Sequence, residues 1–147
     1  MKIELVKAKE TDKNFLLDLR KLTMVKHLEK AGIYLSDEEH VARAHDFFEA
    51  TQILINSSER IGVLKCLETQ NSIEIVQLQI LPQYQGMDIG KGIANDVISK
   101  AQSKNKSVTL KVLKENPARY LYERIGFKIT GEDQYEFHMK KEWSGTS

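Results

Sequence analysis

The chain has 147 residues, of which 41% are hydrophobic and 29% charged, and its net charge is +1. We expect a single globular domain with its own core over residues 1–141, followed by a loose tail over residues 142–147. The near-neutral charge gives no sign of binding to nucleic acid or to an acidic membrane surface. No apolar run is long enough to cross a bilayer.

The amino-terminal third reads as one strand followed by two helices. Apolar and charged residues alternate over residues 2–8, which predicts a strand. An apolar stripe from Asp12 to about Lys30 predicts a helix that Gly32 ends. The capping box of residues 36–39 predicts the start of a second helix. Its inward-facing residues are expected to be Val41, Ala44 and Phe48.

The middle of the chain is rich in strand signals. Residues 52–55 and 61–67 flank a polar turn at residues 57–60, which predicts a hairpin. Residues 73–81 form a longer apolar strand that Pro82 ends.

The remaining elements mix helices and strands. A helix is expected from Gly90 to about Lys104, then a strand over residues 107–113, a helix that begins near Asn116, and a strand over residues 135–139 that closes the sheet. The expected buried residues of the first of these helices are Ile93, Ala94, Val97, Ile98 and Ala101. Together these elements predict an α/β three-layer sandwich with a mixed central β-sheet flanked by helices.

A glycine-rich turn connects the strand before Pro82 to the helix after it. Backbone N–H groups and the positive end of the helix dipole meet there, which favours an anion site. The spacing fits neither common phosphate loop. Three residues separate Gly86 from Gly90, one fewer than in the P-loop, and the third position of the dinucleotide fingerprint is Asn95 instead of glycine.

The turn resembles the acetyl-CoA loop of the GNAT superfamily of N-acetyltransferases, which reads [QR]-x-x-G-x-[GA]. Gln85 and Gly90 match this motif, whereas Asp88 stands where the family has glycine. A carboxylate there can cap the helix but also faces a diphosphate of like charge, which Lys91 can partly offset. The resemblance implies that acetyl-CoA contacts the loop residues Gln85, Gly86, Met87, Asp88, Ile89, Gly90 and Lys91.

A second segment, Asn116 to Phe127, is similar to the GNAT signature N-x-x-A…L-Y-x-x-x-G-F. The resemblance implies that Tyr122 protonates the departing thiolate and that Asn116 contacts coenzyme A. Asn116 lies one residue closer to Tyr122 than in the family's commonest spacing. The alternative for Tyr122 is a packed side chain with a satisfied hydroxyl group.

Acetyl transfer to an amine also needs a base, because a free alkylamine is almost wholly protonated at neutral pH. Glu74 matches the strand glutamate that some GNAT enzymes use, and an apolar row shared with Val76, Leu78 and Ile80 in a regular strand would raise its pKa. The alternative is a solvated edge residue, and the rival position on the next strand is Lys111. The resemblance further implies that backbone groups of Leu78, Gln79 and Ile80 pair with the pantetheine arm.

The histidines have no spacing that suits a metal ion. GNAT folds line the acceptor pocket with the segment that contains Tyr34, His40 and His45, so the resemblance makes these residues candidates for acceptor contact. The alternative is that they have surface or packing roles. The single cysteine, Cys66, permits no internal disulfide and fits a core position. No signal-peptide core is present at the start, so we expect a cytoplasmic protein.

These features predict an N-acetyltransferase that moves an acetyl group from acetyl-CoA to an unidentified amine by direct attack in a ternary complex. We expect a monomer or a homodimer without a nucleic-acid or membrane partner. A non-catalytic acyl-CoA-binding module and a protein-interaction domain on the same fold are the alternatives.

Overall fold

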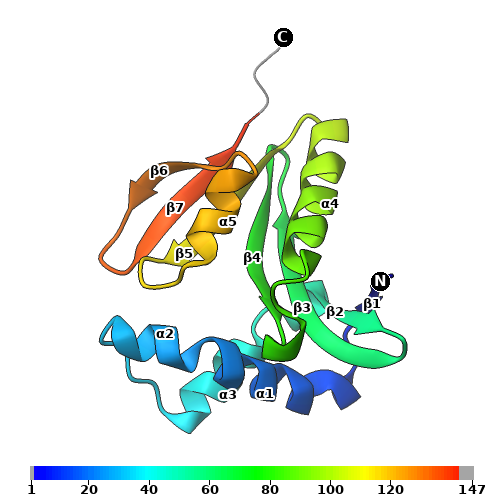
Figure 1. Ribbon diagram of the computed structural model, residues 1–147, viewed down its shortest axis with the longest axis vertical. Coiled ribbons are helices and arrows are strands. Elements are labelled where there is room, and N and C mark those ends of the chain that lie inside the picture. Colours follow the sequence, from blue (N-terminus) through cyan, green and yellow to red (C-terminus); the bar gives the residue numbers. More distant parts are fainter. Residues whose placement is uncertain (1, 143–147) are drawn as a thin grey trace. The chain divides into compact units, whose positions relative to one another are not determined.

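A computed structural model describes residues 2–142 (Figure 1). Within them, one seven-stranded sheet has the order β1-β2-β3-β4-β5-β7-β6. The strands are β1 (Glu4–Lys7), β2 (Thr51–Asn56), β3 (Glu59–Glu68), β4 (Ser72–Ile80), β5 (Ser107–Leu113), β6 (Lys128–Glu132) and β7 (Glu136–Lys141). The helices are α1 (Lys13–Thr23), α2 (Val25–Lys30), α3 (Asp37–His45), α4 (Ile89–Ser103) and α5 (Ala118–Arg124). The predicted fold class, a mixed sheet flanked by helices, is confirmed.

The described chain forms two compact units. The first takes the described residues up to Lys65 together with Gln77–Gly90, and the second takes Cys66–Val76 and the described residues from Lys91 onward. A single domain over residues 1–141 therefore stays a prediction. Most of the predicted tail, residues 143–147, lies outside the described residues.

In the first unit, the helix expected over residues 12–30 is instead two helices, α1 and α2, which lie end to end (Figure 1). The break falls at Met24, whose φ of −114° departs from the helical value. Thr23, the residue just before it, donates through Oγ1 to the carbonyl oxygen of Leu19 at 2.8 Å. A threonine that bonds back to the preceding turn competes with the helical ladder and bends the helix, which accounts for the break.

Helix α3 begins at the predicted capping box. Ser36 Oγ accepts from the N–H of Glu39 at 3.1 Å, and the N–H of Ser36 donates to Glu39 Oε1 at 3.0 Å. Ala44 is buried as expected, but Val41 is 37% exposed, so its predicted inward position is wrong. His40 takes that place because it lies four residues before Ala44 on the same helix face. Phe48 lies beyond the end of α3 and packs, partly buried, against the core.

The predicted hairpin is confirmed as β2 and β3. Its turn residues Ser57 and Ser58 both have positive φ, as two-residue hairpin turns of type I′ require. On β3, Gly62 packs so close to β4 that a Cβ atom would lie 2.5 Å from the carbonyl oxygen of Gln79. No side chain fits in that space, so close strand contact depends on glycine here.

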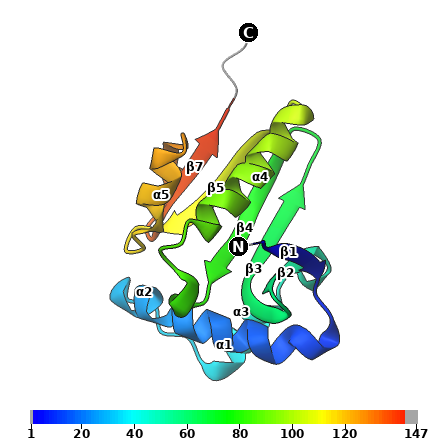
Figure 2. The same cartoon turned by 45° about the vertical axis from the view of Figure 1, so that its right-hand side comes forward.

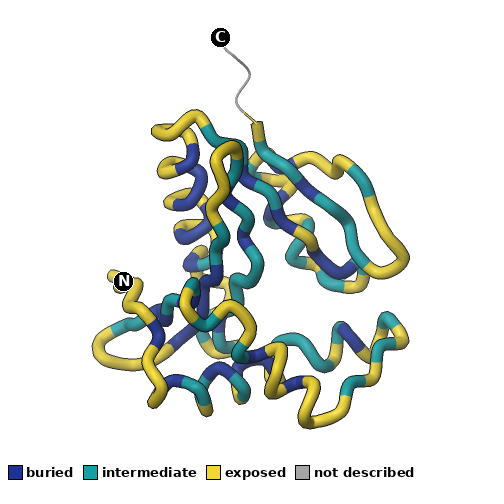
Figure 3. Tube along the Cα trace, turned by 180° about the vertical axis from the view of Figure 1, so that it is seen from behind, coloured by how far each residue is buried: buried dark blue, intermediate teal, exposed yellow. Residues whose placement is uncertain are grey.

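In the second unit, the five apolar residues predicted for the inner face of α4 are all buried. Buried and exposed segments alternate along this helix in Figure 3, and α5 lies beside β5 and β7 in Figure 2. The prediction that residues 135–139 close the sheet is wrong, because β7 lies between β5 and the edge strand β6. Strand β6 lacks a buried face and contains Gly131, so its sequence carries no alternating apolar signal. Among the described residues, no helix has both the length and the apolar character that crossing a membrane requires.

Candidate active site

The glycine-rich turn in the first unit leaves β4 through a short 3-10 turn and enters α4. Gln85 Nε2 donates to the carbonyl oxygen of Ile80 at 2.9 Å, so this side chain braces the turn against the end of the strand. Gly86 has a φ of 79°, a left-handed conformation that favours glycine. From Gln85 to Asp88 the residues are exposed, and Lys91 belongs to the first turn of α4. The exposed turn leads directly into a helix amino terminus, as an anion site requires.

Asp88, the departure from the family motif, also has positive φ, at 62°. Glycine adopts this conformation without cost, and aspartate is among the few other residues that tolerate it. The motif glycine is thus replaced by a residue that keeps the same backbone geometry and adds a negative charge.

The strand β4 pairs with β5 in parallel over only part of its length. The ladder runs from Ser72 opposite Ser107 to Ile75 opposite Leu110, and within the described residues it ends there. Beyond Ile75 the burial pattern also changes: Ile73 and Ile75 are buried, the next four residues are half-buried, and Ile80 is buried. Buried positions therefore switch from odd to even numbers. The apolar row expected for a regular strand from Glu74 to Ile80 is interrupted.

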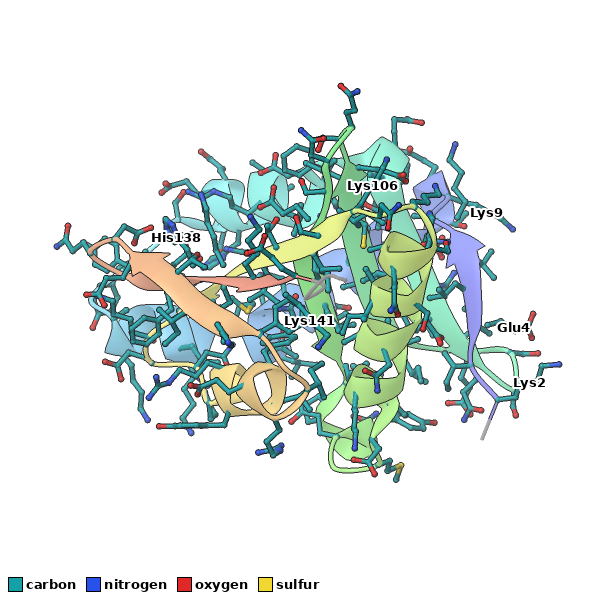
Figure 4. All side chains as sticks on the ribbon, turned by 90° about the horizontal axis from the view of Figure 1, so that it is seen from above. Lys2, Glu4, Lys9, Lys106, His138 and Lys141 are labelled. Atoms are coloured by element: carbon teal, nitrogen blue, oxygen red, sulfur yellow. The ribbon has the colours of Figure 1, made fainter. Side chains whose placement is uncertain are left out.

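Glu74 lies half-buried in the paired part of β4, opposite Thr109 of β5. Strand pairing places Lys111 of β5 opposite His138 of β7, so both lie on the same sheet face as Glu74. Figure 4 shows His138 and Lys141 on opposite sides of β7.

His138 was not predicted to belong to a site, because its neighbours in sequence carry no motif. Its Nε2 lies 2.9 Å from Asp133 Oδ2. The hydrogen bond from His138, followed by backbone N–H groups of Tyr135 and Glu136, lowers the pKa of Asp133 to about 2. The sequence signal that could have placed His138 on the face of Glu74 is the alternation along β7, in which every second residue points to the same face of the sheet.

Tyr122 lies in α5 and is buried, with its ring edge-on to Phe127 at 5.6 Å between centroids. Burial raises the pKa of Tyr122 to about 12. Helix α5 ends at Arg124, and Gly126 just beyond it lies against the side chain of Lys141. Strand pairing puts Lys141 on the sheet face opposite Glu74, so α5 with Tyr122 approaches the sheet from that face. Tyr120 is 52% exposed and hydrogen-bonded by Arg119.

Asn116 has a clear structural role at the start of α5. Its Oδ1 accepts from the N–H of Ala118 at 2.9 Å, which satisfies one of the free donors at the helix start. A contact with coenzyme A stays a prediction for this residue.

Of the three predicted acceptor contacts, only Tyr34 is well exposed, at 73%. His40 is buried, and its Nδ1 accepts from Arg20 Nε at 3.3 Å. His45 Nε2 lies 3.2 Å from the carbonyl oxygen of Lys13. These contacts favour the packing alternative for both histidines.

The first unit also buries a lysine that the sequence did not single out. Lys65 of β3 is 1% exposed, and its Nζ donates to the carbonyl oxygens of Ala44 at 2.9 Å and Asp46 at 2.7 Å. It therefore caps the carboxyl end of α3. Burial, opposed by Asp46 and reinforced by Arg20, lowers the pKa of Lys65 to about 8.

The remaining candidate groups offer no metal or thiol chemistry in the described chain. Residues 2–142 contain no group of three or more His, Cys, Asp or Glu side chains placed to hold a metal ion. Burial raises the pKa of Cys66 to about 11, which keeps it a thiol at neutral pH.

Known proteins similar to this chain were found by sequence and by structure. The family model described as acetyltransferase (GNAT) domain matches residues 27–141. A curated relative, the ribosomal protein bS18-alanine N-acetyltransferase of Haemophilus influenzae, is 35% identical over 75 residues, which are 50% of this chain and 51% of that protein. The chain thus spans about half the length of this relative.

Solved structures resemble the chain over nearly its whole length. The PaiA N-acetyltransferase of Thermoplasma acidophilum in complex with coenzyme A superposes with a TM-score of 0.76 at 22% identity, covering 97% of this chain and 100% of that one. An Arabidopsis thaliana protein in complex with the bisubstrate analogue CoA-Ac-MVNAL superposes with a TM-score of 0.70 at 18% identity, covering 97% and 100%. At these identities the likeness establishes the fold.

Proposed function

We propose, because the chain belongs to the acetyltransferase (GNAT) domain family, that it transfers an acetyl group from acetyl-CoA to an amine. The amine attacks the thioester carbonyl directly in a ternary complex, and coenzyme A leaves as the thiol. We expect the protein to act in the cytoplasm. We also expect it to be a monomer or a homodimer.

The observation that carries the proposal is the turn between β4 and α4. It presents an exposed backbone with two left-handed residues, Gly86 and Asp88, and it opens directly into a helix amino terminus. A diphosphate is the anion that this family binds at the matching motif. In the described chain the β5 ladder stops at Ile75, so the end of β4 before the turn has backbone groups that do not pair with β5, which suits the amides of a pantetheine arm.

The two proposed catalytic groups have separate tasks. Glu74 accepts the proton of the attacking amine, directly or through a water molecule, and Tyr122 donates a proton to the departing thiolate. A Tyr122 pKa of about 12 keeps the phenol protonated at neutral pH, as a proton donor must be.

Two measurements test the proposal. A screen of amines, read as free thiol released from acetyl-CoA, should find at least one acceptor; peptide amino termini with a first alanine deserve inclusion because the Haemophilus relative is named for alanine. Calorimetry should show acetyl-CoA binding that Gly90→Glu abolishes through bulk and charge while circular dichroism stays unchanged. Binding without turnover for every amine would favour the non-catalytic module, and no binding at all would favour the protein-interaction domain.

A further inference from the structure

Strand pairing in the second unit places four residues side by side in one row across the sheet. Glu74 of β4 pairs with Thr109 of β5, which pairs in turn with Lys140 of β7. On the other side of β7, Lys140 pairs with Lys128 of β6. Directly opposite residues of neighbouring strands point to the same face of a sheet. The carboxylate of Glu74 therefore stands at one end of this row, and two lysines stand at the other.

A third lysine extends this group. Lys111 lies on β5, two residues from the position opposite Lys140, so it is on the same face and diagonal to Lys140. Diagonal neighbours of an antiparallel pair are about 7–8 Å apart. His138 lies beside Lys111, but its ring already contacts the carboxylate of Asp133. We therefore define the lysine patch as Lys111, Lys128 and Lys140.

The protein itself neutralises little of the charge of the lysine patch. Lys111 and Lys128 are exposed, and neither makes a hydrogen bond or an ion pair with another residue in the range 2–142. Lys140 Nζ lies 3.5 Å from Glu142 Oε2, and an ion pair between exposed side chains of this kind is weak and exchanges readily. Like charges directly opposite each other, as at Lys128 and Lys140, destabilise a sheet. A bound anion would offset this repulsion.

We propose that the lysine patch binds the acidic side chains of a peptide whose amino terminus is the acceptor. The peptide has its amine at Glu74, the proposed base, and runs across the strands toward Lys128. Neighbouring strands are about 4.8 Å apart, so the patch begins about 8 Å from Glu74 and ends about 14 Å from it. An extended peptide advances about 3.3 Å per residue, so acidic side chains at its second to fourth positions come within reach of the lysines.

This inference rests on the proposed function and narrows its substrate class to acidic peptides. A small amine at Glu74 cannot also reach lysines on β5, β7 and β6, whereas a peptide can. The net charge of the whole chain is only +1, so the attraction is local to this face of the sheet. Polyamines, simple alkylamines and peptides without acidic residues are expected to be poor acceptors.

The test compares two acceptors of equal length and shape, Ala-Glu-Glu-Glu amide and Ala-Gln-Gln-Gln amide, which differ only in three negative charges. For the wild-type protein at low salt, kcat/KM should be about tenfold higher for the glutamate peptide, as the combined effect of two or three exposed ion pairs. Added salt screens the attraction, so this ratio should fall toward one as ionic strength rises.

A double variant tests the lysines themselves. Lys111→Met combined with Lys128→Met removes the two lysines that lack a partner within residues 2–142 and leaves Lys140 in place. It should lower the ratio between the peptides from about tenfold to about twofold and leave kcat/KM for the glutamine peptide unchanged. The matched control, Lys2→Met combined with Lys100→Met, removes the same charge outside the patch and should keep the wild-type ratio.

Stability provides a second readout. Lys128→Met removes the repulsion with Lys140, so its thermal unfolding midpoint should equal or exceed that of the wild type. A variant that is at least as stable and yet discriminates less has not lost its preference by unfolding. A lower midpoint would show that Lys128 stabilises the sheet, and it would overturn the argument for a missing anion.

Failure of this inference is distinguishable from failure of the proposed function. Equal kcat/KM for the two peptides, or a ratio that the double variant leaves unchanged, would overturn the role of the lysine patch while acetyl transfer stands. If neither peptide is acetylated, their binding is compared by calorimetry in the presence of coenzyme A. Tighter binding of the glutamate peptide that the double variant weakens would support the patch even then, and equal or absent binding would overturn it. Binding of a short RNA oligonucleotide through the same lysines, with no preference between the peptides, would assign the patch to nucleic acid instead.

Discussion

Replacing Asp88 tests how the departure from the family motif affects acetyl-CoA binding. Asp88→Asn removes the charge, keeps the shape and retains a residue that tolerates the observed φ of 62°. Asp88→Gly removes the charge and also relieves the left-handed backbone cost, which is about 1 kcal/mol or less for aspartate.

The expected magnitude follows from the exposure of Asp88 in the turn. An exposed carboxylate interacts with a nearby phosphate charge through a water-like dielectric, which gives a repulsion of about 1 kcal/mol at contact distances. Asp88→Asn should therefore bind acetyl-CoA about fivefold more tightly at low salt. Asp88→Gly should bind at least as tightly as Asp88→Asn.

Calorimetric titration with acetyl-CoA at several salt concentrations provides the measurement. Screening weakens the repulsion, so the difference between wild type and Asp88→Asn should shrink as ionic strength rises. Weaker binding by both variants at every salt concentration would refute the repulsion and show that the Asp88 carboxylate is needed to cap α4.

Three further predictions concern the catalytic groups and the buried lysine. Glu74→Gln should lower kcat about 10²-fold at neutral pH with the acetyl-CoA Kd unchanged, and an unaltered pH-rate profile would point to a water relay in place of Glu74. Tyr122→Phe should lower turnover about 10²-fold with little loss of stability, whereas Tyr120→Phe, at an exposed position, should not; the reverse result would transfer the role to Tyr120. The pKa of Lys65 falls from 10.5 to about 8 on folding, so the unfolded chain binds the additional proton between those pH values. The free energy of unfolding of the wild type should therefore rise by about 3 kcal/mol relative to that of Lys65→Met as pH increases through this window. Urea denaturation of both proteins below and above the window measures this difference, and a difference that does not change with pH would contradict the prediction.

The sequence predicted best those elements whose signal is local. The capping box at Ser36 and the apolar face of α4 depend on residues within one helix, and both were found where expected. The break at Met24 was missed because the side-chain bond from Thr23 that bends the helix leaves no mark on the apolar pattern. Edge strand β6 was missed because it buries no face of its own.

In the candidate site too, the features that could be predicted are local in the sequence, and those that were missed are not. The loop from Gln85 to Gly90 was predicted from its glycines and from the strand and helix that flank it, and the structure shows an exposed turn there with left-handed residues at Gly86 and Asp88. The contact of Gln79 Nε2 with Met24 Sδ joins residues 55 apart in the chain, and the position of His138 on the face of Glu74 depends on the pairing of β4, β5 and β7. Spacing along a single sequence carries no record of such contacts.

The position of β4 depends on the absence of a side chain at Gly62, although Gly62 is not proposed to touch any ligand. Any side chain at this position would push against the carbonyl of Gln79, a residue whose backbone is proposed to hold the pantetheine arm. A library that randomises the acceptor-facing residues alone would overlook this position. Conversely, Gly62→Ala would force β3 and β4 apart, because the added Cβ would lie 2.5 Å from a backbone oxygen, and so would change how β4 holds the pantetheine arm without changing any residue proposed to touch it.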